Sequence, residues 1–290
     1  MRAAAIFGPG ASEKDLKPFQ KNSATWFTGL PTSPKEADAV LIFGGDGTIH
    51  RHLEELVKLQ LPVLIVPCGS GNDFARALRL KRVKDAVDAW QKFASGKNNV
   101  CAIDLGVIAS KQSDTGCQRY FCCVAGVGLD SEVARRANKF PRWLRAHGGY
   151  ALTLPSALFH FAPFPMKLSL PDPAQPGTFV LRSAKPTVLA AFANAPSYGG
   201  GMKIAPQARL DDGQLDICLI TDIEKMKLFC LFPTVYFGRH LSIPEVEYFQ
   251  TPALRIETEH PLDVYADGEY VCQTPIEASV ARGALRVIVP

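Results

Sequence analysis

Apolar runs alternate with helical spacings along the first third of the chain. The runs at 3–7, 25–28, 39–43, 62–66 and 100–108 predict strands, most of them buried. Helices are predicted at 13–21, after the turn at 44–48, from 73 onward and at 85–93, whereas 29–38 is rich in Pro, Ser and Thr. Strands that alternate with helices in this way predict a doubly wound, parallel-sheet α/β domain, which we place at 1–105.

The pattern changes after residue 105. Short strands bounded by Pro, Gly, Asp and Asn are predicted at 119–124, 166–170, 179–182, 187–192, 215–221, 254–258, 262–266 and 284–289. Many short strands with turn signals between them indicate an antiparallel β-sandwich or barrel. Two helical segments, 129–140 and 150–161, interrupt the strands. We therefore predict a β-rich second domain at 106–290, an antiparallel β-sandwich with inserted helices.

Composition narrows the class of protein. A hydrophobic content of 47% in 290 residues supplies a sizeable core and argues against disorder. The net charge of +4 is too small to indicate nucleic acid as a partner. The eight cysteines lack the C-x-x-C spacing of zinc sites, which favours reduced, structural thiols. Met1–Phe7 is too short for a signal peptide and no apolar run approaches ~20 residues, so we expect a cytoplasmic protein.

Two glycine-rich turns follow the third and fourth predicted strands. The first is Gly44-Gly45-Asp46-Gly47-Thr48, and the second is Gly69-Ser70-Gly71-Asn72-Asp73. Glycines let a ligand approach the backbone closely, and a helix that begins after such a turn presents unpaired N–H groups. Each turn is therefore a candidate anion-binding site, although a plain tight turn with a solvated Asp is the structural alternative for either one alone.

Together the two turns resemble the diacylglycerol-kinase catalytic family, which includes bacterial lipid kinases and the sphingosine and ceramide kinases. Four further stretches match the family: Ala125–Asp130, Gly199–Pro206, Leu210–Gly213 and Asp267-Gly268-Glu269. The resemblance covers nearly the whole chain. It implies transfer of the γ-phosphate of ATP to a hydroxyl of a diacylglycerol, sphingoid base or related lipid, in a cleft between the two domains.

The resemblance also implies which residues bind the nucleotide. They are Gly8, Pro9, Gly10, Ser12, Thr28, Gly44, Gly45, Asp46, Gly47, Thr48, Gly69, Ser70, Asn72 and Asp73. One departure stands out, because Gly8 occupies the place where the family carries an Asn. Backbone N–H groups of this turn, which Pro9 does not supply, can still contact phosphate, but a side-chain contact is lost.

Magnesium is implied at two places. Asp46, Asp73 and Asp104 follow or end predicted strands, and in the lipid kinases these positions hold the catalytic Mg²⁺ largely through water, as suits an ion that keeps its hydration shell. A second, structural Mg²⁺ would bind the Asp212 carboxylate and the carbonyl oxygens of Arg209 and Gln214. A turn without metal is the alternative there.

The resemblance also implies that Asp267 is the general base for the lipid hydroxyl, with Glu269 supporting it. The sphingosine-kinase branch has also been interpreted with the glycine-loop Asp, here Asp46, as the base. Two other functions compete with a lipid kinase: an NAD kinase, which shares Gly-Gly-Asp-Gly-Thr, and a non-catalytic nucleotide or lipid sensor on the same fold. The stretch Gly71–Arg76 favours the lipid kinases over NAD kinase.

A basic and aromatic segment suggests how the protein reaches its lipid. Basic residues at 135, 136, 139, 142 and 145 are interleaved with Phe140, Trp143 and Leu144. Such a segment suits an anionic membrane surface, although an ordinary solvated helix is the alternative. We expect peripheral association with the membrane, and a homodimer is compatible with the sequence.

Overall fold

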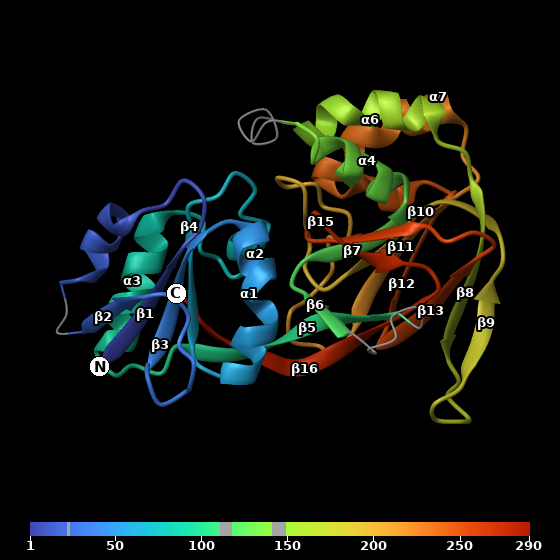
Figure 1. The fold of residues 1–290 in the computed structure, drawn as a ribbon. Helices are drawn as coiled ribbons and strands as arrows, with labels where there is room; N and C mark the ends of the chain where they lie inside the picture. The colour runs from blue at the N-terminus through green and yellow to red at the C-terminus, as the bar shows by residue number, and fades with distance from the viewer. Residues whose placement is uncertain (22–23, 111–117, 141–148) are drawn as a thin grey trace. The chain divides into compact units, whose positions relative to one another are not determined.

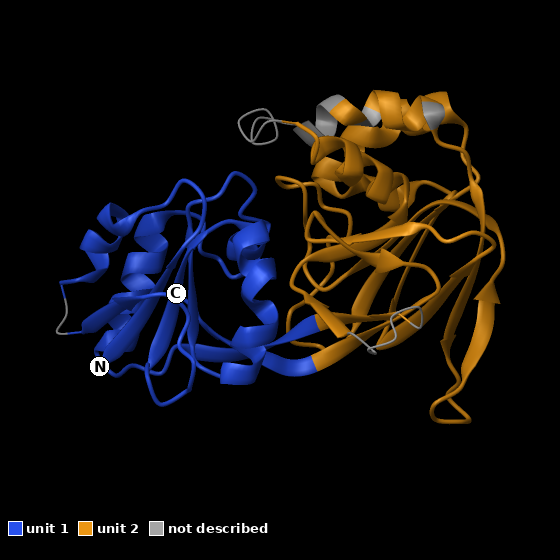
Figure 2. Cartoon of the chain, in the orientation of Figure 1, with its two compact units in different colours: residues 1–105, 282–290 blue, residues 106–281 orange. Residues whose placement is uncertain are grey.

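The computed structural model describes residues 1–290 apart from 22–23, 111–117, 141–148 and some side chains of the helix at 149–160. The chain folds as two compact units: unit 1 comprises residues 1–105 and 282–290, and unit 2 comprises residues 106–281 (Figure 2). The chain leaves unit 1 within strand β5 (Val100–Ser110) and returns to it within β16 (Ile276–Ile288). Residues 282–290, which we placed in the second domain from the sequence, therefore belong to unit 1.

Unit 1 is a parallel sheet with helices on both faces. Its strands run in the order β2 (Thr25–Thr28), β1 (Arg2–Phe7), β3 (Ala39–Gly44), β4 (Val63–Pro67) and β16, each parallel to its neighbour. Figure 1 shows helices α1 (Asp46–Leu59) and α2 (Asp73–Ala77) on one face, with η1 (Glu13–Phe19) and α3 (Val83–Ala94) on the other. All six residues of β3 are buried, as expected for a strand covered on both faces. The predicted α/β fold is confirmed.

Unit 2 is a sandwich of two sheets of mainly antiparallel strands. One sheet runs β12 (Val246–Thr251), β11 (Leu215–Thr221), β10 (Pro186–Ala193), β7 (Val124–Gly128), β14 (Asp263–Ala266) and β15 (Glu269–Gln273). The other runs β9 (Phe179–Ser183), β8 (Phe164–Pro171), β13 (Ala253–Thr258), β16, β5 and β6 (Gln118–Phe121). Side chains from both sheets form one core, in which the rings of Phe121 and Phe192 lie 5.9 Å apart. The predicted sandwich is confirmed.

Helical segments lie beside this sandwich. Helices α4 (Leu129–Ala137) and α6 (Gly149–His160) confirm the two predicted helical segments. Three further helical pieces, α7 (Lys225–Leu231), η2 (Phe232–Phe237) and η3 (Arg239–Ser242), were not predicted, nor were strands β12 and β15. Among the described residues, no helix is long and apolar enough to cross a membrane.

Candidate active site

The first glycine turn joins β3 to α1 and packs against the turn after β1. Gly44 ends β3, Gly45 caps α1, and the Thr48 side chain is buried beneath the turn. A Cβ atom placed on Gly8 would lie 2.3 Å from Thr48 Oγ1, and one on Gly44 would lie 2.6 Å from the same atom. Only glycine therefore fits at Gly8 and Gly44 beside this threonine. The structure thus brings Gly8, Gly44, Gly45 and Thr48 together.

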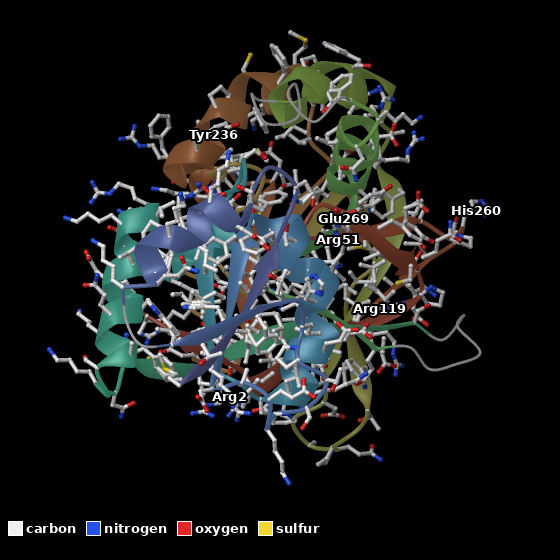
Figure 3. All side chains as sticks on the ribbon, turned by 60° about the vertical axis from the view of Figure 1, so that its left-hand side comes forward. Arg2, Arg51, Arg119, Tyr236, His260 and Glu269 are labelled. Atoms are coloured by element: carbon white, nitrogen blue, oxygen red, sulfur yellow. The ribbon has the colours of Figure 1, made fainter. Side chains whose placement is uncertain are left out.

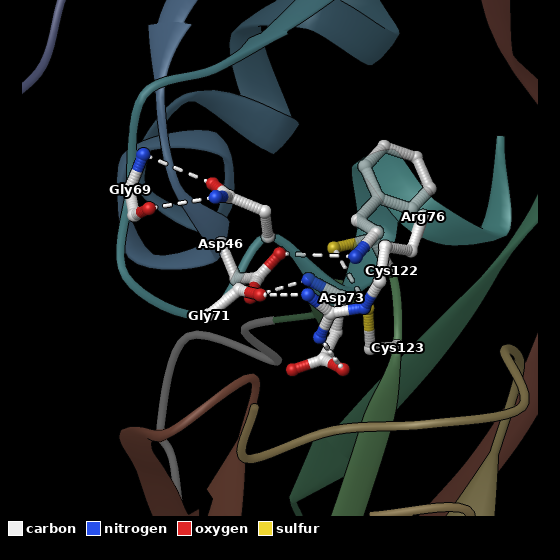
Figure 4. Close-up of polar contacts among 9 residues, drawn as sticks. Asp46, Gly69, Gly71, Asp73, Arg76, Cys122 and Cys123 are labelled. Atoms are coloured by element: carbon white, nitrogen blue, oxygen red, sulfur yellow. Dashed lines mark hydrogen bonds and ion pairs between the residues drawn. The ribbon is translucent and has the colours of Figure 1, made fainter. Parts of the chain in front are cut away.

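The two glycine-rich turns touch backbone to backbone. A Cβ atom on Gly69 would lie 2.3 Å from the Cα atom of Gly45. Asn72, whose backbone is left-handed with φ of 52°, fixes the second turn: its Oδ1 accepts the N–H of Gly69 at 2.9 Å and its Nδ2 donates to the Gly69 carbonyl at 2.6 Å (Figure 4). Asn72 therefore shapes the turn, and this contact uses the Gly69 N–H group.

The Asp46 carboxylate joins the first turn to the second. Its two oxygens accept the backbone N–H groups of Asp73 and Phe74, each at 3.0 Å (Figure 4). Asp73 is buried, and its Oδ1 lies 2.5 Å from Arg76 Nη2. A Cβ atom on Gly71 would lie 2.9 Å from Asp46 Oδ2 and 3.6 Å from Asp73 Oδ2. The two carboxylates therefore flank Gly71 and present oxygens on the same side of the turn.

Asp104 lies on β5 and is buried in unit 1. Its Oδ1 accepts the backbone N–H of Gly283 at 2.8 Å, so the returning strand β16 fixes this carboxylate. Among the described residues, one group of three places its potential metal-ligand atoms within 4.8 Å of one another. That group does not consist of Asp46, Asp73 and Asp104. The structure therefore does not bring these three carboxylates together as a direct ligand set.

The other predicted nucleotide residues are mostly exposed. Ser12 caps η1, where its N–H and its hydroxyl lie 2.8 and 3.4 Å from Asp15 Oδ2. Pro9, Gly10, Thr28 and Ser70 are exposed, and Thr28 ends β2. Gly47 lies in the first turn of α1, and its carbonyl accepts a hydrogen bond from Arg51.

Asp267 occupies the tight turn between β14 and β15 in unit 2. Asp267 and Gly268 both have positive φ, at 51° and 84°, as a type I′ hairpin turn requires. The Asp267 carboxylate accepts the N–H of Cys122 at 2.9 Å and that of Cys123 at 2.8 Å. Half-buried Glu269 begins β15 (Figure 3). Two backbone amides therefore orient the proposed base.

The predicted second metal site is a turn in unit 2. Asp212 Oδ1 accepts the N–H of Gln214 at 3.0 Å, and Gly213 has a φ of 71°. Arg209 pairs with Asp211 rather than with Asp212, its Nε lying 3.1 Å from Asp211 Oδ1. The turn therefore holds the Asp212 carboxylate against its own backbone. A plain turn that binds no metal would show the same hydrogen bond.

An apolar cavity in unit 2 was not predicted from the sequence. The side chains that line it come from α4, α7, η2, η3, β10, β11, β12 and the loops between them. They are Leu129, Asp130, Val133, Leu189, Tyr198, Met202, Ile204, Ile220, Ile223, Leu228, Leu231, Phe232, Val235, His240, Ile243 and Val246. Asp130 Oδ1 accepts the Tyr198 hydroxyl at 2.6 Å. The stretch Ala125–Asp130, which matches the family in the sequence, contributes Leu129 and Asp130 to the lining, and a Cβ on Gly126 would lie 2.5 Å from Asp130 Oδ2.

Burial in this cavity raises the pKa of the Asp130 carboxyl from 3.8 to about 6, and the Tyr198 hydrogen bond offsets part of the rise. Between these two values the folded state binds more protons than the unfolded state, so ionisation of Asp130 destabilises the fold as pH rises. Asp130→Asn cannot ionise and still offers Tyr198 an oxygen. We expect its unfolding free energy, relative to the parent, to increase by about 1.5 kcal/mol from about pH 5 to about pH 8.

Urea unfolding at the two pH values measures this change. Asp211→Asn, at an exposed carboxylate outside the cavity, is the matched control for loss of one carboxylate. A constant difference between Asp130→Asn and the parent at both pH values would contradict the expectation.

Comparison with known proteins finds relatives that match both parts of this chain. Residues 20–108 match the diacylglycerol kinase catalytic domain, and residues 123–289 match the YegS C-terminal NAD kinase beta sandwich-like domain. A diacylglycerol kinase from Mycobacterium tuberculosis (strain CDC 1551 / Oshkosh) is 37% identical over 263 residues, which are 88% of this chain and 78% of that protein. One from Bacillus subtilis (strain 168) is 24% identical over 258 residues, 88% of this chain and 79% of that protein.

Solved structures share the fold. A diacylglycerol kinase from Bacillus anthracis str. Sterne superposes with a TM-score of 0.68 at 18% identity, covering 100% of this chain and 97% of that one. An NAD kinase from Archaeoglobus fulgidus, solved in complex with ATP, gives 0.56 at 14% identity, covering 99% and 93%. Both proteins therefore share the fold of this chain, an α/β unit joined to a sandwich. The chain belongs to the diacylglycerol kinase family of lipid kinases, and the resemblance found in the sequence is confirmed.

Proposed function

We propose that this kinase transfers the γ-phosphate of ATP to a hydroxyl of a diacylglycerol or a related lipid. The apolar cavity of unit 2 carries the proposal. Its walls are almost entirely aliphatic and aromatic, as an acyl chain requires, and its polar groups are few: Asp130, Tyr198 and His240. A dinucleotide acceptor such as NAD would need many more polar partners than such a cavity offers.

Unit 1 would hold the nucleotide phosphates. The first glycine turn opens directly into α1, a helix of 14 residues whose first N–H groups point out of its end. Gly8 and Gly44 bring two turns to this end, and the backbone contact at Gly45 and Gly69 keeps side chains out of it. These features support phosphate binding at Gly8, Gly44, Gly45 and Thr48.

Asp46, Asp73 and Asp104 would hold the catalytic Mg²⁺ through its water ligands. The donor set fits, because all three offer carboxylate oxygens, which a hard cation prefers. The ion would offset negative charge on the transferred phosphoryl group. Asp212, with the carbonyl oxygens of Arg209 and Gln214, would hold a second Mg²⁺.

Asp267 would accept the proton of the lipid hydroxyl, with Glu269 supporting it. A general base must be held in one orientation to be effective, and the amides of Cys122 and Cys123 hold the Asp267 carboxylate. The Asn138 side chain also fixes this turn, since its Nδ2 donates to the Gly268 carbonyl at 2.8 Å.

A transfer assay with radiolabelled ATP tests the proposal. Diacylglycerol, sphingosine, ceramide, phosphatidylglycerol and NAD are offered separately, each in mixed micelles or buffer as its solubility requires. We expect label in a lipid that extracts into organic solvent. Label that appears only in NAD would make the protein an NAD kinase, and binding of ATP without transfer to any acceptor would make it a sensor.

We propose further that the lipid is reached from a membrane surface through an exposed apolar patch on α6, α7 and η2. The predicted docking residues Arg142, Trp143 and Arg145 lie outside the described residues. The patch consists of Phe159, Met226, Phe229, Tyr236 and Phe237, with Tyr236 labelled in Figure 3. The side chains of Leu228 and Leu231 on the same helix, α7, line the cavity. An exposed apolar surface on the same helix that lines an apolar cavity suits a bilayer as its partner, and Lys225 adds a positive charge.

Replacing Phe229 and Phe237 together with Asp should weaken binding to vesicles that contain anionic lipid. Full burial of one Phe is worth about 1.5–3 kcal/mol, so we expect at least a tenfold loss of binding from the pair. Co-sedimentation measures it. The control is Val180→Asp with Leu181→Asp, a pair that is also apolar and exposed but lies on β9. Equal losses in both variants would contradict the assignment of the patch.

A further inference from the structure

Two adjacent thiols and one carboxylate meet in unit 2 at the bend between β6 and β7. Cys122 and Cys123 are buried and reduced, and their Sγ atoms lie 4.0 Å apart. Asp267, which lies 145 residues further along the chain, places its Oδ2 3.3 Å from Cys122 Sγ. One ligand atom of each residue lies within 4.8 Å of the other two. Neither the phosphate turns nor the proposed magnesium sites use these thiols.

The spacing of these atoms matches a tetrahedral zinc site. With Zn–S bonds of about 2.3 Å and a Zn–O bond of about 2.1 Å, two sulfur ligands lie about 3.8 Å apart and a sulfur and an oxygen about 3.6 Å apart. The observed separations of 4.0 and 3.3 Å differ from these values by only a few tenths of an ångström. The third separation, between Cys123 Sγ and the Asp267 carboxylate, is below 4.8 Å, so side-chain rotation would have to bring these two atoms closer for one ion to bind all three.

The backbone around the thiols is held in place by hydrogen bonds. The carbonyl of Cys122 accepts Asn194 Nδ2 at 3.2 Å, and the carbonyl of Cys123 accepts the N–H groups of Asn194 and Ala195 at 2.8 and 3.1 Å. The N–H groups of both cysteines donate to Asp267 itself. Such outer contacts fix the ligands before the ion arrives, which lowers the cost of binding.

We propose that Cys122, Cys123 and Asp267 form a binding site for Zn²⁺. Two thiolates and one carboxylate are a donor set for a borderline-soft ion, and Mg²⁺, which prefers oxygen, does not compete for it. Each thiol gives up its proton to the buffer as its Zn–S bond forms. Three protein ligands leave the fourth tetrahedral position for water.

Zinc bound here would occupy the carboxylate of Asp267. If Asp267 is the general base, a consequence that rests on the proposed function, Zn²⁺ inhibits phosphoryl transfer by competing with the lipid hydroxyl for that carboxylate. The binding site itself requires neither ATP nor lipid, so a failed kinase assay and a failed zinc experiment are distinguishable.

Substitution with Co²⁺ tests the site in the full-length protein. We expect one equivalent of Co²⁺ to give the thiolate-to-cobalt charge-transfer band and the visible bands of a tetrahedral ion, and Zn²⁺ to abolish them. Cys122→Ser and Cys123→Ser should each weaken metal binding by more than the ~10–100-fold that loss of an outer-sphere partner costs. Cys218→Ser, at a thiol equally buried but on β11, is the matched control and should keep the spectrum.

A second measurement needs no variant and therefore does not depend on variant folding. Alkylation of the parent protein, followed by mass spectrometry, should show that Zn²⁺ slows modification of Cys122 and Cys123 but not of exposed Cys101. A parent protein without a thiolate-to-cobalt band at saturating Co²⁺ would overturn the proposal. A band that survives in both Cys122→Ser and Cys123→Ser would also overturn it.

Discussion

Asp46→Asn is expected to lower kcat by at least about 100-fold, the order of loss seen when one preorganised electrostatic group is removed from an active site. The substitution removes a negative charge that would serve Mg²⁺ beside Asp73. If the charge acts on the metal, the loss should be largest at limiting Mg²⁺ and should shrink as Mg²⁺ is raised. Initial rates over a series of Mg²⁺ concentrations measure both effects.

The structure shows that this substitution should also lower the free energy of unfolding, which the sequence did not indicate. Asp46 accepts two backbone N–H groups, and an Asn must turn its NH₂ group toward one of them. We therefore expect the unfolding free energy to fall by about 1–3 kcal/mol. Asp38→Asn is the matched control, because the Asp38 carboxylate also accepts a backbone N–H, that of Arg2 at 2.7 Å, away from the turns. Near-normal kcat at limiting Mg²⁺ would remove the metal role from Asp46.

Asp267→Asn is expected to lower kcat by about 10²- to 10⁴-fold, the usual worth of general-base assistance. The affinity for ATP should change little, because Asp267 belongs to unit 2 and the glycine turns belong to unit 1. Single-turnover rates, together with nucleotide binding by calorimetry, separate the two quantities. Asp46→Asn should disturb the use of Mg·ATP as well.

The control for Asp267 lies in the same hairpin. Asp263 begins β14, and its Oδ1 accepts Gln273 Nε2 at 2.9 Å, so Asp263→Asn removes an equal charge from the same two strands. We expect that variant to keep kcat within a few fold. If Asp267→Asn weakens ATP binding but spares kcat, the roles exchange and Asp46 becomes the base.

Local patterns were sufficient to predict most of unit 1 and the position of its turns. The apolar runs that became β3 and β4 are continuous because both faces of a parallel sheet are buried, and glycines mark the turns because backbone approaches backbone there. The contact of Asp46 with the start of α2 could not be predicted, since it depends on how two successive strand–helix turns pack.

The helix and the strand that the sequence did not predict lack a clear period of apolar and polar residues. Helix α7 has seven residues and is apolar on both the cavity face and the exposed face, so no polar stripe marks it. Strand β12 has half-buried residues at four successive positions from Val246 and therefore shows little alternation. The partners of Asp267 depend on the register that places Ala266 opposite Ala125, which only the assembled sheet determines.

The return of residues 282–290 to unit 1 has a consequence for synthesis on the ribosome. Strand β16 pairs with β4, and its Gly283 N–H caps the buried Asp104 carboxylate. Roughly 180 residues separate the two segments of unit 1, which at ~5–20 residues per second is a delay of about 10–35 s. During that interval the nascent unit 1 lacks an edge strand, and its sheet remains open to chaperones. Unit 2, whose residues are contiguous, is the part of the chain that can complete its fold first.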